Sequence, residues 1–188
     1  QSLWSTDDKP LFMDKKGEHG MSPLMKHFMA GQLAYAREMT AFLAPYVNSY
    51  KRFTIGMFAP TKAVWSADNR TAGFRVCGEH TKAVRVECRI PGSDVNPYLA
   101  CAALLAAGLD GIEKKMALEP ELKGDMYSAK GIREIPGRLE DMELEGIDAE
   151  ICFPSLGLWL YCLDNADAEA ASARLYNDWN DQFLNSNP

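Results

Sequence analysis

The stretch Lys82–Ala100, KAVRVECRIPGSDVNPYLA, decides the expected fold because it joins a strand to the start of a helix. Successive side chains of a strand point to opposite faces, so Arg85, Glu87 and Arg89 would share one face. An Arg side chain offers phosphate and carboxylate oxygens a planar fork of donors, and Glu is a hard oxygen ligand for magnesium. This strand therefore predicts anion-binding groups beside a candidate metal ligand. The opposite face is apolar enough to cover a core: Val84, Val86, Cys88 and Ile90.

The same charge row has a second interpretation, a ladder of cross-strand ion pairs on a solvated sheet, and both stay open from the pattern alone. Taken singly, each Arg of this region suits a surface ion pair. Taken together with Glu87, the cations suit a triphosphate and a carboxylate substrate. The six cations are Arg52, Arg70, Arg75, Lys82, Arg85 and Arg89.

Composition bounds the class of protein. The 188 residues are long enough for one sizeable core or two small ones, and the apolar content of 47% is ordinary for globular proteins. A net charge of −6 without a basic run argues against a nucleic-acid partner. Positive charge is concentrated between Lys51 and Arg89, which favours a small anionic ligand rather than a polyanion.

Cysteine usage and hydropathy predict a cytoplasmic protein without a membrane segment. The five cysteines include no CxxC pair and are expected to be reduced core residues. No apolar run approaches the roughly 18–20 residues of a membrane span, and no signal peptide opens the chain. Because QSLW lacks an initiating Met, the N-terminus is expected to be cut.

The periodicity of the first part predicts an α+β domain. A helix is expected over residues 22–44, capped by Ser22 with Pro at its first position. Asn96 and Pro97 should begin a second helix that runs toward Met116. Strands are expected over residues 62–66, 73–76 and 82–90, and their pattern is typical of antiparallel pairing. Residues 117–137 form a Pro- and Gly-broken connector.

Beyond Gly137 the sequence pattern changes, and it predicts a short helix, a fully apolar strand and another helix. This order is typical of α/β barrels and doubly wound sheets. The sequence therefore predicts two segments, residues 1–137 and residues 138–188.

The motifs SLW, NSYKR, DNRTAGFRV, RVECRIPG, DVNPYLA and GDMY, in this order and spacing, resemble the C-terminal part of the glutamine synthetase catalytic domain. The resemblance runs from Gln1 to about Pro136. It implies a partial catalytic domain with an antiparallel sheet flanked by helices. It also implies ATP-dependent joining of the glutamate γ-carboxyl to ammonia or an amine through γ-glutamyl phosphate, with two Mg²⁺ or Mn²⁺ ions. Family members form ring-shaped homo-oligomers with active sites between subunits.

The resemblance also implies roles for individual residues. Arg52 in NSYKR and Arg89 in VECR resemble a pair of glutamate-site arginines, and Arg70 in DNR resembles the catalytic arginine that stabilises the transferring phosphoryl group. Glu87 resembles a ligand of the metal between ATP and glutamate. Spread positive charge is what phosphoryl transfer needs from a protein. The residues that resemble ATP contacts are Ser2, Arg75, Lys82 and Arg85.

Two departures from the family pattern matter. Ammonium-using members carry a Glu in a GFEAP-like flap, whereas this chain has GMFAP with Phe58. An apolar ring suits a bulkier organic amine, so the pattern is closer to γ-glutamylamide or γ-glutamylpolyamine synthetases. The His-bearing metal motif that precedes QSLW in the family is missing, as are the upstream Glu ligands and the N-terminal β-grasp domain. Glu87 alone cannot hold a metal ion.

Residues 138–188 resemble an internal piece of the amidohydrolase-type hydrolases, a TIM-barrel family of metal-dependent enzymes. This piece contains no His, so none of that family's metal ligands can be assigned to it. The leading hypothesis is thus a partial glutamine-synthetase-like ligase with a short α/β, TIM-barrel-like tail. Two alternatives remain, a metal-dependent hydrolase and an inactive fragment.

Overall fold

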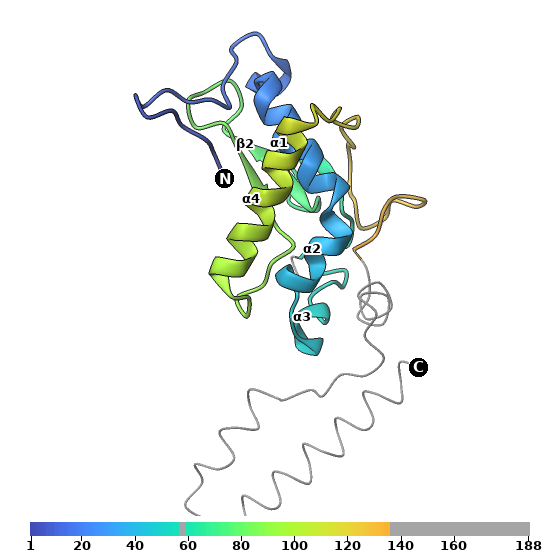
Figure 1. The fold of residues 1–188 in the computed structure, drawn as a ribbon. Helices are drawn as coiled ribbons and strands as arrows, with labels where there is room; N and C mark the ends of the chain where they lie inside the picture. Colours follow the sequence, from blue (N-terminus) through green and yellow to red (C-terminus); the bar gives the residue numbers. More distant parts are fainter. Residues whose placement is uncertain (57–58, 136–188) are drawn as a thin grey trace, which may run out of the picture. The chain divides into compact units, whose positions relative to one another are not determined.

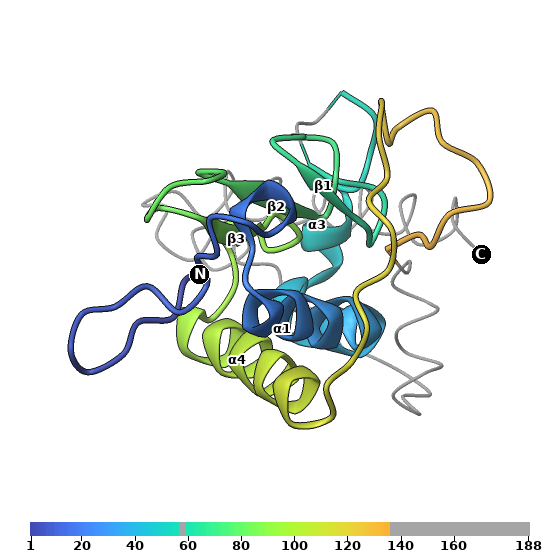
Figure 2. The same cartoon turned by 90° about the horizontal axis from the view of Figure 1, so that it is seen from above.

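The computed structural model describes residues 1–56 and 59–135, all of them within one compact unit, Gln1–Asp148. A layer of helices covers one face of a small sheet, and α1 and α4 lie side by side in that layer (Figures 1 and 2). Within the described ranges, no helix is long and apolar enough to span a membrane. The elements in chain order are η1 (Glu18–Gly20), α1 (Pro23–Ala34), α2 (Ala36–Leu43), α3 (Val47–Tyr50), β1 (Trp65–Ala67), β2 (Phe74–Cys77), β3 (Arg85–Cys88) and α4 (Pro97–Glu113).

Both long helices begin where the sequence predicts. The Ser22 hydroxyl accepts a hydrogen bond from the Met25 amide at 3.2 Å, and Pro23 occupies the first helical position of α1. At α4, the Asn96 side chain accepts from the amides of Tyr98 and Leu99 at 3.0 and 3.3 Å. These caps satisfy backbone donors that have no partner inside the helix.

The predicted helix over residues 22–44 is two helices rather than one. Tyr35 leaves helical geometry (φ −101°, ψ 14°) and separates α1 from α2. Its hydroxyl donates to Asp110 of α4 at 2.7 Å and accepts from Lys114 at 3.1 Å. Apolar spacing continues across the break, with Met39 and Leu43 buried, so periodicity alone could not locate it.

The sheet is mixed, which corrects the prediction of an antiparallel sheet. Its order is β1-β2-β3, with β1 and β2 parallel and β2 and β3 antiparallel. The connection of residues 68–73 brings the chain back to the start of β1. There Gly73 passes so close to Lys62 that a Cβ would lie 2.6 Å from the Lys62 carbonyl oxygen. Glycine at position 73 thus permits the parallel pairing.

The apolar face of β3 lies in the core, as predicted. Val84, Val86 and Ile90 are buried against a cluster that includes Met25 and Phe28 of α1. Full burial of such side chains contributes about 1.5–3 kcal/mol each. Cys88 is only half-buried. Of the cysteines predicted to be core residues, Cys77 is buried but Cys101 is exposed, whereas Cys152 and Cys162 lie outside the described residues.

The predicted TIM-barrel-like fragment of residues 138–188 lies outside the described residues. The boundary near residue 137 falls there too and stays a prediction.

A charged cluster around His19 joins η1 to two loops, which carry Glu79 and Glu121. His19 Nδ1 lies 2.7 Å from Glu79 and Nε2 lies 3.1 Å from Glu121, while the side chain is only 21% exposed. Since both partners are carboxylates, both ring nitrogens act as donors when the ring is an imidazolium. Burial lowers the pKa of His19, but the two carboxylates outweigh burial and raise it above its ordinary value.

We expect stability to fall as pH rises through the raised pKa of His19. The imidazolium is stabilising in full below its unfolded pKa of about 6.5 and is lost above the folded value. His19→Asn keeps a residue that tolerates the left-handed backbone (φ 53°) but removes the ring. It should lower the free energy of unfolding by about 1–2 kcal/mol at pH 6 and by less at pH 8.5. Denaturant titrations at both pH values measure this difference.

His80→Asn is the matched control, because His80 is exposed and has a similar φ of 56°. An equal pH dependence in the wild type and in His19→Asn would show that the His19 cluster does not set it.

Candidate functional site

The charge row on β2 and β3 forms the centre of the candidate site. Arg75 of β2 and Glu87 of β3 are direct cross-strand partners, and Arg75 Nη1 lies 3.2 Å from the Glu87 carboxylate. Arg89, just after β3, places its Nη1 3.5 Å from the same carboxylate oxygen. Both arginine side chains are 18% exposed and Glu87 is 41% exposed. A single carboxylate thus holds two guanidiniums at the sheet surface.

Asp68 holds the other side of Arg75, a partner that the sequence did not predict. Arg75 donates to Asp68 from Nε at 3.1 Å and also from Nη2. The Arg75 hydrogen bond keeps the pKa of Asp68 below its ordinary value. Asp68 reaches Arg75 from the turn after β1, where its own φ is 45°. Arg75 is therefore fixed between two carboxylates, Asp68 and Glu87.

The turn that carries Arg70 is tied to the end of β3. Arg89 Nε donates to the Arg70 carbonyl at 3.0 Å, and the Asn69 side chain accepts from the Thr71 amide at 2.9 Å. The Arg70 side chain is exposed. The structure thus brings Arg70 to the charge row through its backbone.

Arg52 reaches the same end of β3 from the loop after α3. Its Nη1 donates to the Ile90 carbonyl at 3.0 Å. Gly92 leaves room for this side chain, because a Cβ there would lie 3.0 Å from Arg52 Nη1. The Arg52 side chain thus turns toward the backbone at the end of β3.

Three of the residues predicted to contact ATP lie apart from this network. Ser2 is exposed, and its hydroxyl accepts from Trp4 Nε1 at 3.2 Å. Lys82 is exposed before β3, and Arg85 is exposed and donates to the Ala83 carbonyl at 3.1 Å. Among the described residues, neither Lys82 nor Arg85 forms an ion pair with Glu87. Of the six cations, the structure therefore gathers Arg75 and Arg89 at Glu87 and ties Arg52 and the Arg70 backbone to the same end of β3, whereas Lys82 and Arg85 lie apart.

Both interpretations of the charge row agree with this geometry. The pairing of Arg75 with Glu87 is the cross-strand ladder of the second interpretation, and each such pair contributes about 0.2–1 kcal/mol. The ladder also fixes two guanidiniums before any ligand arrives. Such preorganised positive charge is what binding of phosphate or carboxylate oxygens requires.

The described residues do not complete a metal site. Glu87 supplies one carboxylate, and both neighbouring guanidiniums point at it. No group of three or more His, Cys, Asp or Glu side chains in the described ranges could hold a metal ion. A divalent ion at Glu87 needs further oxygen ligands.

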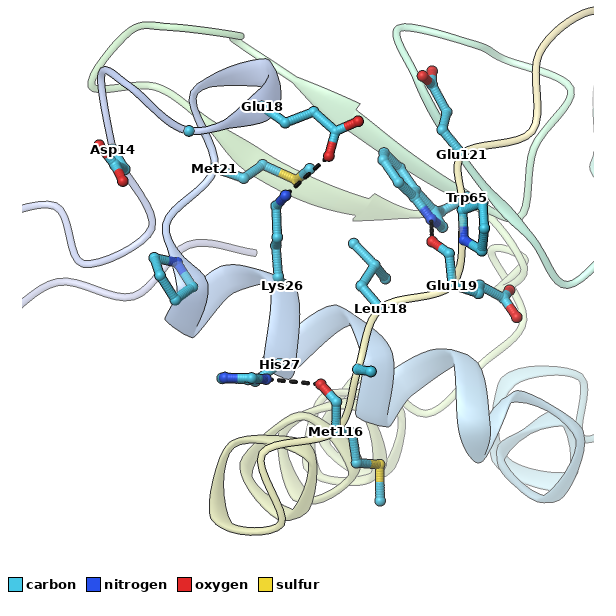
Figure 3. Close-up of a pocket in the computed structure, with 14 residues that line it drawn as sticks. Asp14, Glu18, Met21, Lys26, His27, Trp65, Met116, Leu118, Glu119 and Glu121 are labelled. Carbon is cyan, nitrogen blue, oxygen red and sulfur yellow. Dashed lines mark hydrogen bonds and ion pairs between the residues drawn. The ribbon is translucent and has the colours of Figure 1, made fainter.

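A cavity of about 390 Å³ lies elsewhere, between the start of α1 and the segment after α4 (Figure 3). Trp65 faces it and donates to the Glu119 carbonyl at 2.8 Å, and Lys26 pairs with Glu18 across its rim. None of the predicted site residues lines it. The cavity is thus separate from the charge row.

Comparison with known proteins agrees with the motifs. The family model "Glutamine synthetase, catalytic domain" matches residues 1–148. Gamma-glutamylethanolamide synthetase GlnA4 of Streptomyces coelicolor is 54% identical over 110 residues, 58% of this chain and 24% of that protein. The glutamine synthetase of Mycolicibacterium smegmatis is 46% identical over 129 residues, 68% of this chain and 27% of that protein. The one from Thermus thermophilus is 41% identical over 142 residues, 72% of this chain and 32% of that protein.

A solved structure of GmaS without ligand has the same fold over the matched region. It aligns with a TM-score of 0.66 and 33% identity, covering 96% of this chain and 41% of that chain. The chain thus spans about a quarter to a third of the curated relatives it matches. The predicted amidohydrolase-like tail finds no support in these matches. Because the family model covers well over half of the sequence, this chain belongs to the glutamine synthetase catalytic-domain family.

Proposed function

We propose that this chain contributes the glutamate- and phosphate-binding part of an ATP-dependent ligase. The enzyme joins the γ-carboxyl of glutamate to ammonia or an organic amine through γ-glutamyl phosphate. The observation that carries the proposal is the network of Arg75, Glu87 and Arg89, with Arg52 and Arg70 tied to the same end of β3. Membership of the family supports it.

The proposed chemistry needs charge neutralisation rather than a nucleophilic side chain. The glutamate γ-carboxylate attacks the terminal phosphorus of ATP, ADP leaves, and the amine then displaces phosphate from the acyl phosphate. Arg70 neutralises charge on the transferring phosphoryl group, and Arg52 and Arg89 bind glutamate. Arg75, Lys82, Arg85 and Ser2 are proposed to contact the nucleotide, and the network that holds Arg75 would orient it.

The cofactors are proposed to be ATP and Mg²⁺ or Mn²⁺, with Glu87 as one metal ligand and the others supplied from beyond the described residues. A divalent ion would add positive charge next to the phosphates. The active enzyme is proposed to be a cytoplasmic homo-oligomer.

An organic amine is the proposed acceptor, as in the relative named gamma-glutamylethanolamide synthetase. Phe58, which lies outside the described residues, stands where ammonium-using members carry Glu. A phenyl ring can neither bind nor deprotonate ammonium, whereas a carboxylate can do both.

We expect Phe58→Glu to shift amine preference toward ammonia by about tenfold or more in the ratio of kcat/KM values, the size of one good charge-assisted contact. Steady-state rates with ammonium and with ethanolamine measure the ratio. Phe53→Leu serves as control, since Phe53 lies nearby in sequence but before the flap. An unchanged ratio in Phe58→Glu would remove position 58 from the amine site.

The experiment that tests the proposed function is ATP-dependent γ-glutamyl hydroxamate formation. It is run on the 188-residue chain and on an exchange enzyme, in which the aligned 110 residues replace those of the Streptomyces coelicolor relative. Activity of the exchange enzyme near that of the parent supports the proposal. A folded exchange enzyme without activity contradicts it, and ATP-independent, metal-dependent hydrolysis by the chain would favour a hydrolase.

A further inference from the structure

The loop that carries Arg52 is attached to the segment after β3 at a second point, away from Arg52 itself. The Ser49 hydroxyl donates to Asp94 Oδ2 at 2.6 Å. Ser49 is fully buried, and its Oγ also accepts from the Tyr46 amide at 3.1 Å. Removal of the Asp94 carboxylate would leave the buried Ser49 hydroxyl without its acceptor, and a buried donor without a partner is costly.

This contact bears directly on Arg52. The Arg52 amide donates to the Ser49 carbonyl at 3.3 Å, so the backbone of Arg52 starts from the residue that Asp94 holds. At the other end of the side chain, Nη1 donates to the Ile90 carbonyl. Arg52 is thus held at its backbone and at its guanidinium by two points of one segment, Ile90–Asp94.

Gly92 completes the arrangement. A Cβ at this position would lie 2.4 Å from Asp94 Oδ1 and 3.0 Å from Arg52 Nη1. The side chains of Asp94 and Arg52 therefore occupy the space that any larger residue at position 92 would need. Ser49 and Asp94 hold the backbone of Arg52, and Gly92 leaves space for its side chain.

We propose that Ser49, Gly92 and Asp94 are positioning residues that fix the Arg52 guanidinium at the end of β3 for the carboxylate of glutamate. The inference rests on the proposed role of Arg52 in glutamate binding. Arg89 lies one residue before Ile90, the residue that accepts from Arg52, so the two arginines meet at one strand end. Displacement of a binding group by about 1 Å can cost up to 100-fold in rate.

The test compares KM for glutamate, KM for ATP and kcat in the exchange enzyme and its variants. Ser49→Ala and Asp94→Ala should each raise the glutamate KM about tenfold, while kcat and the ATP KM change less than about threefold. Asp94→Asn keeps an acceptor oxygen for the Ser49 hydroxyl and should restore most of the affinity. The double variant should cost little more than either single one, because both remove the same contact.

Ser93→Ala is the matched control, an exposed serine in the same loop, and should leave all three constants unchanged. Asp94 is exposed, so its variants test the contact even if Ser49→Ala fails to fold. Glutamate KM values within twofold of the parent in both Asp94 variants, alongside a raised KM in Arg52→Ala, would overturn the positioning role and leave the proposed function standing. No change in Arg52→Ala would instead defeat the glutamate role of Arg52. A lower kcat together with higher KM values for both glutamate and ATP would show that the contact is merely structural.

Discussion

Replacing Gly111 with alanine is expected to lower the free energy of unfolding by about 2 kcal/mol or more. A Cβ at Gly111 would lie 2.3 Å from the His27 carbonyl oxygen and 2.7 Å from the Gly31 backbone, so α1 and α4 would have to separate. Helix propensity alone predicts the opposite sign, a gain of about 1 kcal/mol for Gly→Ala. The sign of the change in denaturant titrations therefore decides which effect wins.

Ala106→Gly is the control for propensity, since Ala106 is exposed on the same helix and should lose only about 1 kcal/mol. Gly31→Ala should behave like Gly111→Ala, because its Cβ would lie 2.1 Å from the Ala107 carbonyl oxygen. A stabilised Gly111→Ala would mean that the two helices are not as close as this packing requires.

Replacing Arg70 with alanine is expected to reduce kcat for hydroxamate formation at least about 1,000-fold in the exchange enzyme. The Arg70 side chain is exposed and contributes only its carbonyl to the charge row, so folding should be little affected. A guanidinium that meets the transferring phosphoryl group stabilises charge that is greatest in the transition state. Binding of ATP, measured by calorimetry, should change far less than kcat.

Arg37→Ala serves as control, because Arg37 is an exposed arginine of α2 away from the charge row. If Arg70→Ala keeps more than about a tenth of the parent rate, the phosphoryl group is stabilised by another residue and the assignment of Arg70 is wrong.

Much of the site could be predicted from local patterns. The alternation in VRVECRI placed Arg85, Glu87 and Arg89 on one face and the buried Val84 and Val86 on the other, because a strand has a period of two. The partners of these groups could not be predicted in the same way. Asp68 is bonded to Arg75 only because the turn after β1 returns the chain alongside β2, and no local spacing encodes that return.

By itself, the sequence determined the helix starts at Ser22 and Asn96, the two faces of β3 and the family, since each depends on neighbouring residues or on ordered motifs. Only the tertiary structure decided the parallel pairing of β1 with β2 and the attachment of Arg52 through Ser49 and Asp94. It also separated Lys82 and Arg85 from the Glu87 network. The physical reason is that these contacts depend on the path of the turns and on how whole elements pack, which short-range periodicity does not specify. Ser49 and Asp94 are 45 positions apart, and the pairing of β1 with β2 depends on how the turn between them runs.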